Sequence, residues 1–142
     1  MNGRILTFYL CGNLFGIDIN AVKEIDRNID YTPVPDAAPH IVGLLNMRGQ
    51  IVTLINLARL MGYEYAAPKE RPACVILKNS PENPDYAGFI IDRPGSVIDV
   101  EDSFCEPAPA NITSQEARFI REVARLDSRL IVIISRDIIT EQ

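Results

Sequence analysis

Short runs of apolar residues, broken by glycine, proline, asparagine and aspartate, recur along the whole chain. Residues 5–11 and 15–19 flank a short loop that contains Gly12, and this pattern predicts an antiparallel hairpin at the start. The later runs also have the length and composition of strands. They cover residues 73–77, 86–91, 96–100, 120–126 and 130–134, with Asp127 and Ser128 as the turn of a last hairpin.

A second hairpin is expected in the first half of the chain. Residues 41–47 and 51–57 are apolar and flank a polar tip that contains Arg48 and a glycine. The preceding stretch, 31–40, holds prolines that exclude a helix and favour extended backbone, so we expect a connector or an edge strand there. The hairpin therefore presents Arg48 at its tip.

A few segments fit helical turns better than strands. Apolar residues three apart within 20–25 predict one turn, with Lys23 and Glu24 facing outward. Two further single turns are expected at 57–62 and 135–139, and residues 63–72 resemble a surface loop. Residues 118–126 fit either a strand or an amphipathic helix that is capped near Ser114, and the pattern leaves both open.

Many short strands without alternating long helices favour an all-β fold of closed or nearly closed antiparallel barrels over a parallel α/β sheet. The length of 142 residues fits a single domain, 1–142, that buries its own core. The expected core residues share inward-facing positions on the strands. They are Phe8, Leu10, Leu45, Ile55, Phe89, Ile91, Ile131 and Ile133.

Composition narrows the possible partners and the cellular location. A net charge of −5 disfavours nucleic acid and anionic lipid. No apolar run reaches the roughly 20 residues of a spanning helix, and the start lacks a signal peptide's cleavage pattern, so we expect a cytoplasmic protein without direct membrane insertion. Cys11, Cys74 and Cys105 are odd in number and far apart, which indicates buried, reduced thiols.

Motifs for catalysis are missing from the sequence. The chain has one histidine, His40, and lacks a nucleophile elbow, a phosphate-binding loop and paired zinc ligands. We therefore expect no enzymatic activity, no cofactor and no metal, and we favour protein–protein interaction. The alternative is a small-ligand-binding or catalytic β-barrel unrelated to chemosensing, which requires a deep pocket with a few convergent polar groups.

Four stretches resemble the CheW family of chemotaxis adaptors and together cover nearly the whole chain. They read FGIDINAVKEI, PHIVGLLNMRGQIVTLINL, AGFIIDRPGSVIDV and DSRLIVIIS. The resemblance implies two five-stranded antiparallel barrel lobes that share an apolar core. It also implies an adaptor that couples the cytoplasmic tip of a methyl-accepting chemoreceptor to the regulatory domain of a CheA-like histidine kinase, recruited to receptor arrays at the inner face of the membrane.

The same resemblance implies the partner-binding residues. Those that match the family's receptor and kinase contacts are Ile19, Val22, Glu24, Ile25 and Arg48, and those that match its pattern in the lobe that meets the kinase are Gly88 and Asp92. From the residues alone, a structural or solvated surface position is the favoured interpretation of Arg48, and a solvated face is the usual one for a lone carboxylate such as Glu24. Ile19, Val22 and Ile25 have the spacing of a core stripe as well as of a recognition patch, so we expect part of this set to be buried.

Three positions depart from the family pattern. Thr53 stands where proline is usual, Asn56 where aspartate is usual, and Pro94 where an aliphatic residue is usual. A divergent paralogue accounts for them and leaves open which chemosensory system the chain serves. A detached kinase regulatory domain, or a scaffold of another two-component system, is the competing interaction hypothesis.

Overall fold

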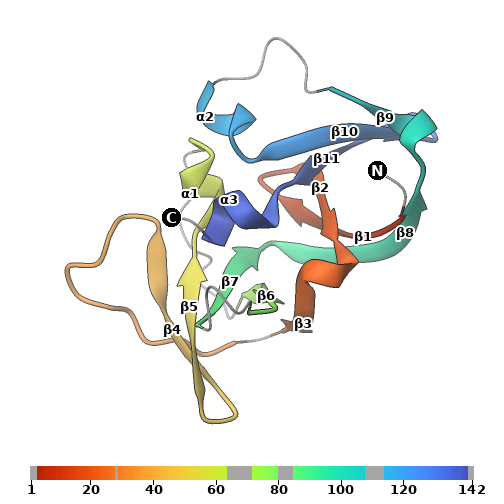
Figure 1. Cartoon of the computed structure of the whole chain (residues 1–142). Coiled ribbons are helices and arrows are strands. Elements are labelled where there is room, and N and C mark those ends of the chain that lie inside the picture. The colour runs from red at the N-terminus through yellow and green to blue at the C-terminus, as the bar shows by residue number, and fades with distance from the viewer. Residues whose placement is uncertain (1–2, 28, 64–71, 80–84, 108–113, 141–142) are drawn as a thin grey trace.

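The computed structural model describes residues 3–27, 29–63, 72–79, 85–107 and 114–140, and it shows two β-sheets side by side (Figure 1). The first sheet has the order β8-β1-β2-β11-β10-β9. Its strands are β1 (Gly3–Leu10), β2 (Asn13–Asp18), β8 (Arg93–Val100), β9 (Cys105–Glu106), β10 (Ile120–Leu126) and β11 (Arg129–Ile134). The second sheet has the order β3-β6-β7-β5-β4. Its strands are β3 (Val22–Asp26), β4 (Ile41–Met47), β5 (Gln50–Ile55), β6 (Ala73–Leu77) and β7 (Tyr86–Ile91).

Helical segments in the described residues are single turns. They are η1 (Ile19–Ala21), α1 (Leu57–Leu60), η2 (Asp102–Phe104), α2 (Ser114–Ala117) and α3 (Arg136–Thr140). The turns expected at 57–62 and 135–139 are confirmed as α1 and α3. No helix in this described part of the chain is long and apolar enough to cross a membrane.

The all-β prediction with two lobes, one for each sheet, is confirmed, but the described strands form two sheets with free edges rather than closed barrels. Two further details of the sheets differ from the expectation. The first sheet contains six strands rather than five, because the two-residue β9 pairs with β10. Two pairs are parallel, β2 with β11 and β5 with β7. Both parallel pairs join strands that are far apart in the sequence, so turn residues, which specify only hairpins, gave no signal for them.

The helical turn expected over 20–25 was wrong from Val22 onward. The turn η1 ends at Ala21, and β3 follows, with a β-bulge between Val22 and Glu24. A bulge inserts one extra residue, so Val22 and Ile25 face the same side of the sheet although they are three apart. Spacing of three in a bulged strand imitates the spacing of a helical turn, which explains the error.

The other boundaries follow the sequence closely. β4 has the expected bounds, whereas β5 spans Gln50–Ile55 instead of 51–57, because the N-cap Asn56 and α1 follow it. The stretch before the hairpin is a connector whose Thr32 forms an isolated bridge with Leu44. Residues 120–126 form a strand, so the helical alternative is wrong. The strand expected from Ser96 begins earlier, at Arg93. The predicted loop at 63–72 lies mostly outside the described residues.

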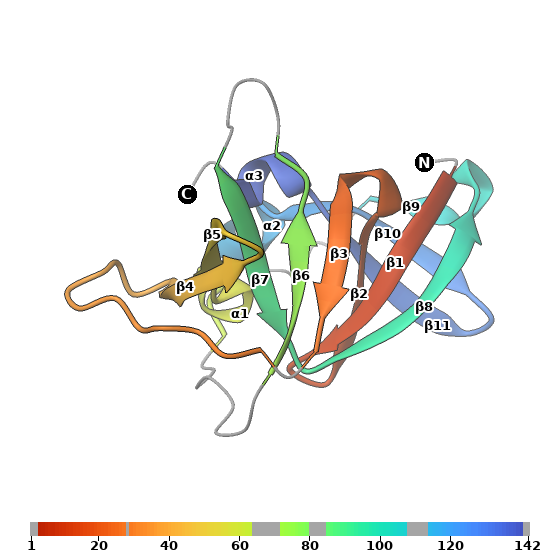
Figure 2. The ribbon, with the colours of Figure 1, turned by 90° about the horizontal axis from the view of Figure 1, so that it is seen from below.

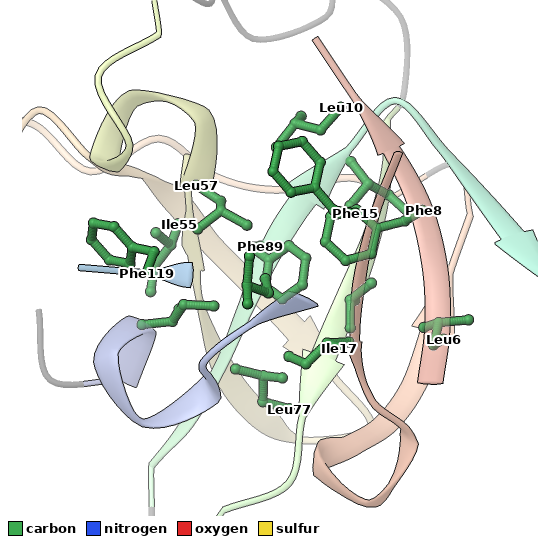
Figure 3. Packing of buried hydrophobic residues seen from close by; sticks show 14 of the residues in the cluster. Leu6, Phe8, Leu10, Phe15, Ile17, Ile55, Leu57, Leu77, Phe89 and Phe119 are labelled. Carbon is green, nitrogen blue, oxygen red and sulfur yellow. The ribbon is translucent and has the colours of Figure 1, made fainter. Parts of the chain in front are cut away.

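An apolar core at the junction of the sheets connects the two lobes. Phe8 of β1 packs against Phe15 of β2, with ring centroids 5.8 Å apart, and against Phe89 of β7, at 5.2 Å (Figure 3). One cluster therefore draws side chains from both sheets. All eight residues expected in the core are buried. Of the three cysteines, which are free thiols, Cys74 is buried whereas Cys11 and Cys105 are half-buried.

The chain crosses directly from one lobe to the other after β7. Figure 2 shows β7 leading into β8 at the base of the two sheets, with Asp92 as the residue between these strands. A smaller apolar cluster fills the inside of the second lobe and includes Leu54, Cys74 and Ile76.

Candidate partner-binding site

Arg48 lies at the tip of the β4–β5 hairpin, which projects from the body of the protein (Figure 1). Arg48 and Gly49 both have positive φ, +51° and +85°, as in the two-residue turns that suit twisted hairpins. The Asn46 side chain supports the turn by accepting a hydrogen bond from the Gly49 amide at 3.1 Å. The Arg48 side chain is 72% exposed, so the hairpin presents most of the guanidinium to solvent.

Glu24 of β3 holds one side of this guanidinium. Nη2 of Arg48 donates to Oε1 of Glu24 at 2.5 Å, and the Glu24 side chain is only 25% exposed. In the second sheet, β3 and β4 are the two edge strands. Because the ion pair joins one edge to the hairpin of the other edge, the sheet must curl until its edges approach each other. The structure thus joins two side chains that are 24 positions apart in the sequence and that the family resemblance predicts to bind a partner.

The bulge in β3 divides its side chains between two environments. Val22 and Ile25 pair with Leu77 and Val75 and pack into the junction core. Glu24 and Asp26 pair with Ile76 and Cys74, both members of the inner cluster of the second lobe. The two carboxyl groups therefore share one face of β3, an edge strand of the second sheet. We call this edge, where Glu24 meets Arg48 of the β4–β5 hairpin, the rim of the second lobe.

Burial and charge change the acidity of groups on this face. Desolvation raises the pKa of Asp26, and the neighbouring Glu24 carboxylate raises it further, whereas Arg48 lowers it. Desolvation also raises the pKa of the Cys74 thiol, to about 12, with Asp26 adding to the effect. Cys74 is thus an un-ionised thiol at neutral pH and serves as a small apolar side chain.

The three aliphatic residues expected to bind a partner, Ile19, Val22 and Ile25, contribute mainly to packing. Val22 is 9% exposed and belongs to the junction core, while Ile19 and Ile25 are half-buried against it. The expectation that part of this set is buried is confirmed. The exposed Lys23, which lies between Val22 and Glu24 in the sequence, is placed over the Tyr86 ring at 4.9 Å.

Gly88 and Asp92 occupy different surroundings from Arg48. Gly88 is buried in β7 and pairs with Ile76, the residue that pairs with Glu24 on its other side. A Cβ at Gly88 would lie 2.8 Å from the backbone oxygen of Val75, so close strand packing accounts for the glycine. Their roles in partner binding stay predictions.

Asp92 organises the crossing between the lobes. Its carboxylate accepts a hydrogen bond from the Cys11 amide at 3.0 Å, and its own amide donates to the Tyr9 oxygen at 2.9 Å. The next residue, Arg93, stacks over the Tyr9 ring at 4.1 Å. Asp92 thus fixes the β1–β2 turn against the start of β8 while its side chain remains exposed.

Two residues beside Arg48 were missed in the sequence. Ile51 is 55% exposed and lies near the hairpin tip, separated from the Arg48–Gly49 turn by Gln50. Asp26 stands two positions after Glu24, and residues two apart share a face only in a strand. The helical interpretation of residues 20–25 therefore hid Asp26, whereas Ile51 gave no signal because it lies in an apolar run.

The departures from the family pattern fit their positions. Pro94 lies in β8, an edge strand of the first sheet, where a missing amide hydrogen is tolerated. Thr53 lies half-buried in β5 between Leu44 and Ala87. Asn56 is the N-cap of α1, and its side chain accepts a hydrogen bond from the Arg59 amide at 3.1 Å. Asparagine and aspartate cap helices equally well.

We expect Asn56→Ala to lower the free energy of unfolding by about 1 kcal/mol, because the cap acceptor is lost at a buried site. The matched variant Asn56→Asp keeps an acceptor oxygen and should cost much less. Urea denaturation of both variants measures the difference. Equal losses would show that the cap contributes little and that another contact of Asn56 matters more.

The chemistry of the site suits the recognition of a charged group on a partner rather than the binding of a metal ion. Within the described ranges, no group of three or more histidine, cysteine, aspartate or glutamate side chains is placed to hold a metal ion. Arg48 supplies several donors in a fixed fork, which suits a carboxylate of a partner protein. The arrangement therefore has the chemistry of an ionic anchor beside exposed apolar surface.

Comparison with known proteins identifies the family to which the chain belongs. The family model of the CheW-like domain matches residues 4–141. A chemotaxis protein CheW of Treponema pallidum (strain Nichols) is 31% identical over 134 residues, which cover 92% of this chain and 78% of the relative. A chemotaxis protein CheW of Bacillus subtilis (strain 168) is 26% identical, with 98% of this chain and 87% of the relative covered.

A solved structure has the same fold. The scaffolding protein TtCheW from Thermoanaerobacter tengcongensis superposes with a TM-score of 0.81 at 28% identity, covering 95% of this chain and 90% of that one. The fold and these matches define a two-lobed β module, and the chain belongs to the CheW-like domain family. It is a chemotaxis scaffold or adaptor protein of the CheW kind and is not an enzyme.

Proposed function

We propose that the chain couples the cytoplasmic tip of a chemoreceptor to the regulatory domain of a CheA-like histidine kinase. The observation that carries this proposal is the Arg48 guanidinium, which is held by Glu24 at the rim of the second lobe and yet largely exposed. Membership of the CheW-like family supports the choice of partners. The cytoplasm is the proposed location, at receptor arrays on the inner face of the membrane.

The Arg48 side chain held by Glu24, which we call the anchor, has the properties of an interface hot spot. Glu24 fixes one side of the Arg48 guanidinium, so less side-chain entropy is lost when the remaining donors bind a partner carboxylate. The exposed Ile51 supplies apolar area beside it. Arginine beside an apolar side chain is a common composition for the centre of a protein interface. We propose that a receptor helix contacts this rim.

The remaining candidates are assigned supporting roles. Val22, Ile19 and Ile25 tie β3 to the junction core, so they fix where Glu24 stands. We propose that Asp92, at the crossing between lobes, contributes to the kinase contact through its exposed carboxylate. Gly88 is proposed to act by letting β6 and β7 pack closely rather than by touching a partner.

The mechanism we propose is assembly without any change in covalent bonds. The chain, acting as one unit over residues 1–142, holds the receptor with one surface and the kinase with another. Simultaneous binding raises the effective concentration of each partner near the other, and many linked contacts in an array make modest single affinities sufficient. Signal output then remains with the kinase.

Arg48→Ala should weaken binding to the receptor's cytoplasmic hairpin about tenfold, because a hot-spot arginine is lost. The free energy of unfolding should fall by less than about 1 kcal/mol, the range of an exposed ion pair. Calorimetric titration and thermal melting measure the two effects. The matched control is Arg4→Ala, which removes an exposed arginine paired with Asp99 at 3.2 Å on the other lobe. Equal binding by Arg48→Ala and the unsubstituted protein would contradict the proposal.

A further inference from the structure

A cavity of about 280 Å³ lies on the first lobe, on the side that carries α1 and α2. Most of its wall is apolar and comes from β2, β10 and β11, with Phe15, Val123 and Val132 among the lining side chains. Met61, which follows α1, adds to this apolar wall. The described residues that line the cavity do not include those of the Arg48 anchor, so the proposed function does not use this cavity.

Hydrogen bonds fix the two helical turns beside this cavity. Gln115 of α2 donates from Nε2 to the Leu60 oxygen of α1 at 3.0 Å, and Figure 1 shows α1 and α2 close together. The Tyr63 amide donates to the Ala58 oxygen of α1 at 2.9 Å. These bonds hold Tyr63 and Glu116, the residue after Gln115, in places where both line the cavity. The cavity is therefore formed before any ligand binds, as small-molecule pockets usually are.

Three polar side chains line the cavity besides its apolar wall, and they are Asn13, Tyr63 and Glu116. Glu116 is the charged residue among the described lining residues, none of which is a lysine or an arginine. Desolvation raises the pKa of the Tyr63 hydroxyl, and the nearby Glu116 carboxylate raises it further. A carboxylate and a tyrosine ring both attract a cation, and the net charge of −5 repels anions from the protein as a whole. The polar part of the cavity therefore suits a positively charged group.

We propose that this cavity binds a small amphiphilic cation, an ammonium group on a short apolar body. Glu116 pairs with the ammonium, the Asn13 side-chain oxygen accepts one of its hydrogen bonds, and the Tyr63 ring adds a cation–π contact. The apolar wall takes the body of the ligand. The volume of about 280 Å³ lies just below the usual range of small-molecule pockets, so the body must be short. The site is separate from the Arg48 anchor and is tested independently of it.

Titration of the full chain with three matched probes tests the inference. The probes are n-hexylammonium, n-hexanol and n-hexanoate, which share one alkyl body and differ in the charge of the head group. In methyl and amide NMR spectra, hexylammonium should shift the signals of Met61, Leu130 and Val132 saturably, in the millimolar range expected of so small a ligand. It should bind about fivefold more tightly than hexanol, the upper range for a partly exposed ion pair, and hexanoate should bind most weakly.

Two substitutions separate the charged part of the site from the apolar part. Glu116→Gln should remove the preference for hexylammonium over hexanol and leave hexanol binding nearly unchanged, because the apolar wall is intact. Its matched control is Glu106→Gln on β9, where the carboxylate pairs with Arg125 at 3.0 Å and does not line the cavity. Leu130→Ala should weaken all three probes by roughly two- to fivefold, since it removes apolar lining that is 40% exposed. Its control is Val97→Ala, which truncates a 48% exposed side chain on β8.

The outcomes distinguish a cation site from other uses of the cavity. The inference predicts that hexylammonium binds best and that Arg48→Ala changes none of the three affinities. It is overturned if no probe gives saturable shifts, if all three bind equally, or if the preference for hexylammonium survives Glu116→Gln. Shifts of Leu130 and Val132 that appear only with the kinase regulatory domain would also overturn it, because they would assign the cavity to a side chain of a partner protein.

Discussion

Replacement of Phe8 by alanine should lower the free energy of unfolding by about 3 to 5 kcal/mol, the range for a fully buried phenylalanine. Phe8 is 0% exposed and contacts Phe15 within its own sheet and Phe89 in the other sheet. Removing its ring leaves a cavity between the lobes. Because one cluster serves both sheets, we expect both lobes to lose stability together, in a single urea-induced transition.

The matched control for Phe8 is Phe104→Ala. Phe104 is 36% exposed, so its truncation should change the free energy of unfolding by no more than about 0.5 kcal/mol. Fluorescence and circular dichroism should give coincident transitions for each variant. Two separate transitions in Phe8→Ala would contradict a shared core, as would a loss comparable to that of the control.

Gly88→Ala should lower the free energy of unfolding by about 1 to 3 kcal/mol, the usual cost of overpacking. The added Cβ would lie 2.8 Å from the Val75 oxygen, an atom of the paired strand's backbone that cannot rotate away. Relief requires β6 and β7 to separate, and β6 also carries the partners of Glu24 and Asp26. Chemical denaturation measures the loss.

Binding by the folded fraction of this variant separates two interpretations of Gly88. If the glycine only permits close packing, the folded fraction should bind the receptor hairpin and the kinase domain with nearly unchanged affinity. A variant that keeps full stability and loses kinase binding would instead place Gly88 in direct contact with the partner. The two outcomes differ in both measurements.

The hairpins and the core could be predicted from sequence because their signals are local. Turn residues such as Gly49 mark the β4–β5 tip, and runs of apolar residues place Phe8 and Phe89 inside. The parallel pairing of β5 with β7 had no such signal, since it joins segments that are distant in the sequence. Topology of this kind depends on how the whole chain packs.

The candidate site was only partly predictable for a related reason. Glu24 and Arg48 were selected through resemblance, but their ion pair depends on curvature that brings opposite sheet edges together. Asp26 was missed because the bulge at Val22 imitates helical spacing. A bulge is a property of strand pairing, so the pattern of a single segment does not reveal it.

The central claim is that this chain links a receptor to a kinase through separate surfaces. Its most direct test is sedimentation of membranes that contain a chemoreceptor, after incubation with the kinase regulatory domain in the presence or absence of this chain. We expect the kinase domain to sediment with the membranes only when the chain is present, and much less with Arg48→Ala. Kinase sedimentation that is independent of the chain, or its absence in both conditions, would contradict the claim.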